Sequence, residues 1–419
     1  MFLPPRPPDQ RQALRELFSS RDFALLWIGQ LLSQIGDQCL LIAAMTLITN
    51  LSRSPLAMLI PAISIAAPQL VFGLVGGVMA DRWDRKRLMI ASDMLRGLIV
   101  LAVLLVRSVS DLWILYLAAA SLTLVGVFFY PARNAAIPSI VPHGLLLAAN
   151  SLIQGSYIVA LIVGPVIAGL LVELWAPAAI LFDSVSFFVS AVFIAVMVIP
   201  RGAIQQQEAE KRTVWADMKA GLEFIRQNRV LHQVLITMAV ATLGIGAVVL
   251  LAIPHLKQQL EAGGLEYGGA MSVLGIGSVL GGLLVSRLSR HLSASTLVGG
   301  LMILAGIAII VFAWAPTYWA VLISVAVLGM SVVMARGALE TIVQALTPDA
   351  VRGRVQSATN LLVVISTTSA QGLSAVLGAL LGVQSIFVAA GVLTALTGAV
   401  AMYILREAAR LVGKKWAVG

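Results

Sequence analysis

The dominant feature of the chain is a series of twelve apolar stretches, each about as long as a membrane-spanning helix. An α-helix needs roughly 20 mainly apolar residues to cross the hydrocarbon core of a bilayer, which is about 30 Å thick. Charged residues make up only 11% of the 419 residues, whereas a soluble domain has roughly 25%. The stretches fall at 23–50, 56–80, 88–106, 112–136, 148–174, 177–199, 231–256, 267–286, 295–314, 317–340, 355–382 and 384–405.

This pattern predicts an all-α membrane protein with twelve transmembrane helices in two bundles of six. The stretches are too long for the strands of a membrane barrel, which need only about 9–11 residues each. We expect a tail at 1–22, a first bundle at 23–199, a linker at 200–230 that carries an amphipathic helix, a second bundle at 231–405 and a tail at 406–419.

The basic residues predict the orientation. If the N-terminus is cytoplasmic, 23 of the 28 Lys and Arg residues fall in cytoplasmic segments, three (Arg53, Arg107 and Lys257) fall on the outer side, and two (Arg133 and Arg336) lie within the stretches. Such an excess is the positive-inside signal of membrane proteins. We therefore expect a multi-pass protein of the inner (cytoplasmic) membrane with both termini cytoplasmic, and the net charge of +9 requires no nucleic-acid partner.

Enzymatic and metal chemistry find little support in the sequence. Cys39 is the single cysteine, and the four histidines are far apart, which argues against a zinc or haem site. Neither a Walker A motif nor a GxSxG motif is present. We expect no enzyme activity, no metal and no cofactor.

The two halves of the chain resemble each other. Residues 76–85 follow the second stretch, and the similar residues 281–290 follow the eighth. Arg133 in the fourth stretch has a counterpart, Arg336, in the tenth. Parallel repeats of this kind, with a substrate site near the membrane midplane, are a transporter architecture.

A loop motif at Gly77, Asp81, Arg82, Arg85 and Lys86 resembles the signature loop between helices 2 and 3 of the major facilitator superfamily. The runs at 29–37, 130–133, 149–151 and 164–169 are similar to the branch that holds enterobactin exporters, macrolide efflux pumps and lysophospholipid transporters. The resemblance implies a two-bundle fold, alternating access and a loop that stabilises the outward-facing state. The alternative for the loop is a basic segment that fixes the membrane orientation and has no gating role.

Asp37 is the main candidate for a functional residue. It lies about 14 residues into the first stretch, or roughly 21 Å along a helix, where an acid costs about 2.5–3.5 kcal/mol to insert. We expect Arg133 of the fourth stretch to be its partner, and expect Asp37 to take and release a proton. The alternative is a permanent ion pair that fixes helix packing. Gln30 and Gln34 share its helix face, where they either bind substrate or join helices.

Further candidates lie outside this face. Asp93 and Arg96 either extend the loop network or pair with each other, at i, i+3. We expect Asp183 to face a hydrated outer vestibule or to serve transport, and expect Arg336 and Glu340 to pair locally, at i, i+4. The remaining candidates are the Gly164-Pro165 step, which either resembles an export motif or is a simple kink, and Gln371 in a polar segment that could line the path.

The sequence therefore predicts a secondary active transporter, a proton-coupled exporter of a bulky amphiphile such as a drug, macrolide or siderophore. The alternatives are a lysophospholipid flippase of the same superfamily and a non-transporting membrane scaffold. The expected coupling ion is H⁺, with Na⁺ as the alternative. The expected partners are the amphiphile or lysolipid and the membrane lipids, and we expect a monomer.

Overall fold

The computed structural model of the chain describes residues 10–52, 54, 56–80, 83–199, 223–289, 291–348 and 351–406. These residues are helical nearly throughout, and none of them forms a strand. The α-helices are α1 (Gln10–Ser19), α2 (Arg21–Leu51), α3 (Leu56–Ala80), α4 (Arg85–Ala102), α5 (Leu112–Ile140), α6 (Leu146–Val196), α8 (Arg229–Leu260), α9 (Gly264–Leu288), α10 (Ala294–Ala313), α11 (Tyr318–Leu346), α12 (Arg352–Leu381) and α13 (Val383–Ile404).

The predicted twelve spans are confirmed in the described part of the chain. Each predicted stretch coincides with a helix, except that α6 carries two stretches in 51 residues. Its helix is broken at Trp175, whose φ of −168° and ψ of 105° are extended. Pro177 follows two residues later and has no N–H for the preceding turn, so the second span begins anew there.

The chain divides into two compact units. Unit 1 contains the described residues up to Leu47 and from Ala67 to 199, and unit 2 contains Ile48–Ala66 and the described residues from 223 onwards. The predicted first bundle, 23–199, differs from unit 1 in residues 48–66. These residues group with unit 2 because the end of α2 contacts α8, where Lys257 Nζ donates a hydrogen bond to Asn50 Oδ1.

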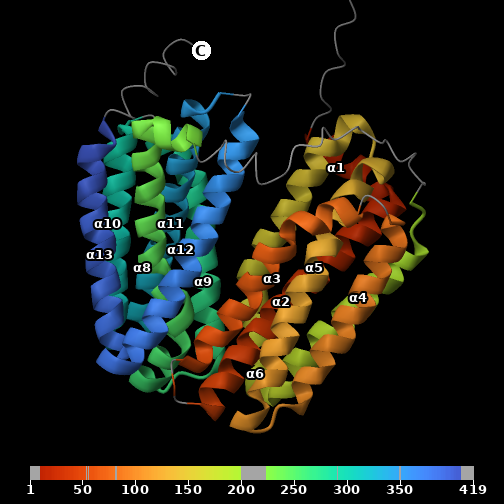
Figure 1. Cartoon of the computed structure of the whole chain (residues 1–419). Coiled ribbons are helices and arrows are strands. Elements are labelled where there is room, and N and C mark those ends of the chain that lie inside the picture. Colours follow the sequence, from red (N-terminus) through yellow and green to blue (C-terminus); the bar gives the residue numbers. More distant parts are fainter. Residues whose placement is uncertain are drawn as a thin grey trace, which may run out of the picture. The chain divides into compact units, whose positions relative to one another are not determined.

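In unit 1, α4 packs against α5 and α6 (Figure 1). The α4 helix begins at Arg85 because the Asp84 side chain accepts a hydrogen bond of 2.9 Å from the Arg87 amide, which satisfies one of the free N–H groups of the first turn. An apolar cluster that includes Leu17 of α1, Phe23 of α2, Met89 of α4 and Phe129 of α5 forms the core beside it.

In unit 2, α10 packs against α11 and α13, α9 against α11, and α8 against α12 and α13 (Figure 1). The α10 and α13 backbones meet closely at Gly299 and Gly398, where a Cβ on Gly299 would lie 2.5 Å from the Gly398 carbonyl oxygen. Small residues allow such packing between membrane helices, where van der Waals contact replaces the hydrophobic effect.

Several predicted features lie outside the described residues. They are Asp81 and Arg82 of the loop motif and the linker as far as residue 222, including most of the predicted amphipathic helix. Gly77 lies within helix α3.

Candidate functional site

The α4 helix buries two charged residues in its middle, Asp93 and Arg96. Asp93 has none of its surface exposed, and Arg96 has 6%. Met94, Leu95 and Leu98, on the other face, are each more than 40% exposed. Charges that face the protein interior, with apolar side chains outside, are the arrangement expected of functional groups within a membrane.

The Arg96 guanidinium is held by groups from three helix segments. Its Nη1 lies 3.7 Å from Asp93 Oδ1, one turn away on α4. Its Cζ lies 4.5 Å from the ring centroid of Phe129 and 5.3 Å from that of Tyr130, both on α5, and 5.5 Å from that of Phe187 on α6. The aromatic faces stabilise the cation by cation–π attraction, which is worth about 2 kcal/mol when the cation is desolvated.

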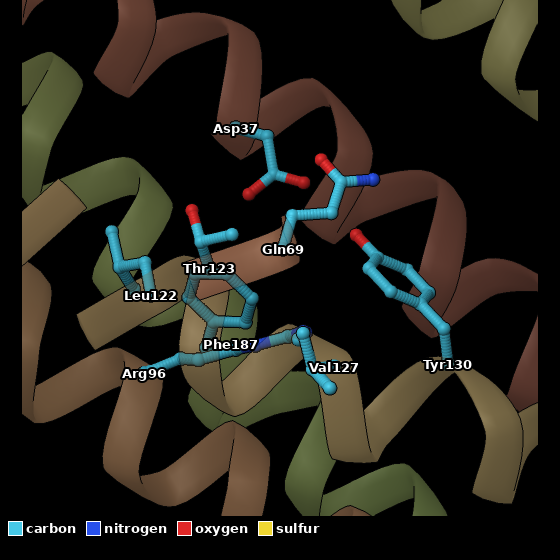
Figure 2. Close-up of a pocket in the computed structure, with 9 residues that line it drawn as sticks. Asp37, Gln69, Arg96, Leu122, Thr123, Val127, Tyr130 and Phe187 are labelled. Atoms are coloured by element: carbon cyan, nitrogen blue, oxygen red, sulfur yellow. The ribbon is translucent and has the colours of Figure 1, made fainter. Parts of the chain in front are cut away.

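Asp37 opens onto a cavity of about 440 Å³ within unit 1. Its side chain is exposed there, and the lining also includes Arg96, Gln69, Thr123 and Tyr130. Figure 2 shows the Asp37 carboxylate, the Gln69 amide and the Tyr130 hydroxyl directed towards the same space. Asp37 interacts electrostatically with Arg96, so a carboxylate and a guanidinium face one cavity.

A third acid, Asp183 of α6, lies against Gly36, the residue before Asp37. It is fully buried and interacts electrostatically with both Asp37 and Arg96. The α2 and α6 backbones approach at Gly36, where an added Cβ would contact Asp183 Oδ1 and lie 2.6 Å from Ser186 Oγ. Only glycine allows this approach, so the residue before Asp37 determines how close the two acids lie.

These four side chains form what we term the charge cluster: Asp37, Asp93, Arg96 and Asp183. Within the described part of the chain, no hydrogen-bond donor reaches the carboxylate oxygens of Asp93 or Asp183. Three carboxylates thus face a single guanidinium. Burial of an ionised carboxylate without compensation costs several kcal/mol, so such a cluster can lower its energy by binding protons.

The predicted ion pair between Asp37 and Arg133 does not form in the described structure. Arg133 Nη1 donates to Gln30 Oε1 at 3.1 Å, and Nη2 donates to Asn134 Oδ1 at 3.1 Å. Arg133 lies at the level of Gln30 in the membrane and not at the level of Asp37. Gln30 comes seven residues before Asp37, which is about 10 Å along the helix. Arg96, rather than Arg133, is the cation beside Asp37.

The environment of Asp183 differs from the predicted hydrated vestibule, because its carboxylate is fully buried. Asp93 and Arg96 form the i, i+3 pair that was one of the two alternatives for them. The helical period could have indicated their importance, since Ser92, Asp93, Arg96 and Gly97 share one face of α4, which is otherwise apolar after its first turn.

Two basic residues of the loop motif, Arg85 and Lys86, bind backbone carbonyl groups of neighbouring helices within unit 1. Arg85 Nη1 donates to the Ala135 carbonyl oxygen of α5 at 2.9 Å, and Lys86 Nζ donates to the Met197 carbonyl oxygen at the end of α6 at 2.8 Å. Lys86 lies at the C-terminus of α6, where a cation is stabilised by the helix dipole. These contacts attach the start of α4 to its neighbours.

The remaining predicted residues lie apart from the charge cluster. Gln34 accepts a hydrogen bond of 3.4 Å from the Ser156 hydroxyl. Arg336 Nε donates to Glu340 Oε1 at 2.9 Å, so this pair is local as predicted. Gly164 precedes Pro165 within α6 and lets α6 approach α2, since a Cβ there would lie 2.7 Å from Gln38 Cβ. Gln371 is half-buried on α12.

Comparison with known proteins identifies relatives along almost the entire chain. The model of a family described as transmembrane secretion effector matches residues 16–412. Macrolide efflux protein A of Streptococcus pyogenes is 23% identical, over 88% of this chain and 93% of its own. The multidrug efflux pump Tap of Mycolicibacterium fortuitum is 26% identical, over 91% and 95%. A bacterial homologue of the human lysosomal transporter Spinster, in its inward-facing, unoccupied conformation, has a similar fold, with a TM-score of 0.71 at 14% identity over 95% of this chain and 98% of its own.

Proposed function

Because the chain belongs to the transmembrane secretion effector family of the major facilitator superfamily, we propose that it is a proton-coupled exporter of a bulky amphiphile that works by alternating access. The observation that carries the proposal is the charge cluster. One of its acids, Asp37, opens onto a cavity, while the other two are buried beside a single guanidinium.

The charge balance supports coupling to protons. When Asp37 is ionised, Arg96 must balance three carboxylates, and each unbalanced charge is costly in a low-dielectric interior. A proton on Asp37 removes one negative charge and frees Arg96 to interact more strongly with Asp93 and Asp183. The preferred arrangement of α2, α4 and α6 then depends on whether Asp37 carries a proton, which is the property that a coupling site requires.

The relatives support an exporter of drug-like molecules. Macrolide efflux protein A and the pump Tap are efflux proteins by name. A cavity of about 440 Å³ that presents a carboxylate, an amide and a phenol beside apolar walls suits an amphiphile with a polar group, since ligand sites combine apolar walls with a few polar groups.

A lysophospholipid flippase is the second candidate. The observation that favours it is that Asp37 and Arg96 line the same cavity, because a carboxylate and a guanidinium together complement a zwitterionic headgroup. A non-transporting scaffold is less consistent with the cluster, since charged groups within a membrane are costly and a scaffold has no use for them.

The rest of the proposal follows from the topology and the family. We place the protein in the inner membrane with both termini cytoplasmic, and we propose that it acts as a monomer, without enzyme activity or a bound cofactor. Its partners are the transported amphiphile and the membrane lipids.

The test is transport by the purified full-length protein in proteoliposomes with an imposed pH gradient. The cargoes are a cationic dye, a macrolide, a siderophore and a labelled lysophospholipid, and a parallel series uses a sodium gradient. We expect pH-driven flux of the dye or the macrolide. The Asp37→Asn variant should lose the gradient-driven flux and still bind the cargo.

The matched control is Glu173→Gln, the same change at an exposed acid of α6 in the same unit, which should transport normally. Normal pH-driven flux in Asp37→Asn would contradict the proposed coupling site. Flux driven only by a sodium gradient would show that Na⁺, rather than H⁺, is the coupling ion. Flux of the lysophospholipid alone would favour the flippase. The absence of flux for every cargo would favour the scaffold.

A further inference from the structure

A second cavity lies within unit 2, among α8, α10, α11, α12 and α13. Its volume is about 200 Å³. Eleven of its sixteen lining residues are apolar or glycine, and they include Ala241, Met302 and Leu339. An apolar cavity of about 150 Å³ is large enough to hold a benzene molecule, so this cavity has room for one ring-sized group.

Among the hydroxyl groups that line this cavity, one has no hydrogen-bond partner within the described residues. Thr242, Thr367 and Thr394 donate hydrogen bonds of 2.7–2.8 Å to carbonyl oxygens of their own helices. Ser331 of α11 is fully buried, and within the described residues its hydroxyl has no hydrogen-bond partner. An unsatisfied buried hydroxyl is unfavourable, and a ligand with one hydroxyl or carbonyl group would satisfy it.

No acidic side chain is among the described residues that line this cavity. The one charged side chain among them is Arg336, which is 61% exposed and pairs through Nε with Glu340. A cationic ligand group would therefore lose its hydration without gaining an acidic partner. The cavity of unit 1 is different, because it presents the Asp37 carboxylate.

We infer that the cavity of unit 2 is a binding subsite for an uncharged, ring-sized apolar group that bears one hydroxyl or carbonyl, with Ser331 as its hydrogen-bond partner. The inference rests on the proposed function in one respect, since it makes this group the apolar part of the transported amphiphile. Binding of the group can be measured without transport.

The experiment uses the full-length protein with Cys39→Ala, which removes the single cysteine of the chain, and adds Ala241→Cys as a reporter in the cavity. The rate of alkylation of this thiol by N-ethylmaleimide is measured with benzyl alcohol, toluene or benzylammonium present. Ala399→Cys, at an exposed position of α13, is the matched control for effects of the solutes on the membrane or the reagent.

We expect benzyl alcohol to slow alkylation of the Ala241→Cys variant at concentrations that leave the Ala399→Cys variant unaffected. Benzylammonium should give no protection. Adding Ser331→Ala should raise the concentration of benzyl alcohol needed for protection about three- to tenfold, the effect of one hydrogen bond between uncharged groups, and leave protection by toluene unchanged.

Three results would overturn the inference: equal protection of both cysteine positions, protection by benzylammonium as strong as that by benzyl alcohol, or no effect of Ser331→Ala on benzyl alcohol. None of these results depends on a gradient. Loss of proton coupling in the transport assay would therefore leave the subsite intact, and failure here would leave the coupling intact.

Discussion

Replacement of Arg96 by methionine tests the charge cluster most directly. The change keeps a long, flexible side chain and removes the cation that, in the described part of the chain, lies beside Asp93 and Asp183. Asp93 is fully buried at 3.7 Å from the guanidinium. Two unit charges 4 Å apart attract by about 4 kcal/mol at an effective dielectric constant of 20, which agrees with the roughly 3–5 kcal/mol lost when a buried pair is broken.

We therefore expect Arg96→Met to lower stability by about 3–5 kcal/mol. For a unit of 150–250 residues this corresponds to a fall in Tm of roughly 6–20 °C, at about 2–4 °C per kcal/mol. The measurement is thermal unfolding of the purified full-length protein in detergent. The deficit should shrink at acidic pH, because a protonated carboxyl needs no cation.

Two further variants make the reasoning refutable. Arg87→Met is the matched control, because Arg87 is exposed near the start of the same helix, and it should have little effect. Adding Asp93→Asn to Arg96→Met should reverse much of the fall in Tm, since it removes the buried carboxylate that Arg96→Met leaves without a cation. The explanation fails if Arg96→Met costs no more than Arg87→Met, or if Asp93→Asn does not restore stability.

Two other changes test the packing around the site. Gly36→Ala should lower the Tm by an amount equivalent to about 1–3 kcal/mol, the usual cost of overpacking, because its Cβ would contact Asp183 and Ser186. In Gly155→Ala the Cβ meets nothing within 4 Å, so this control should be neutral or slightly stabilising, and equal Tm values for the two variants would contradict the close approach. Lys86→Met should remove a hydrogen bond to the end of α6 and speed hydrogen exchange there, measured by mass spectrometry; unchanged exchange would show that this contact does not stabilise the helix end.

The sequence by itself determined the membrane topology. Within lipid every backbone N–H and C=O must be satisfied inside the protein, so each long apolar stretch has to become a helix. This is why the predicted spans coincide with the helices, and why the break between the fifth and sixth spans lies near Pro177. Pairs within one helix were equally predictable, since the helical period alone places Arg336 beside Glu340 and Asp93 beside Arg96.

Only the tertiary structure decided which charges meet across helices. Two residues on different helices approach each other only when they lie at the same depth in the membrane and when both helices are rotated so that the side chains face each other. The hydrophobic period of a single helix determines neither of these quantities. Arg133 lies at a different depth in the membrane and bonds to Gln30, whereas Arg96 lines the same cavity as Asp37. Asp183 joined them because Gly36 lets the α2 and α6 backbones come close, and such a contact depends on the detailed packing of both helices.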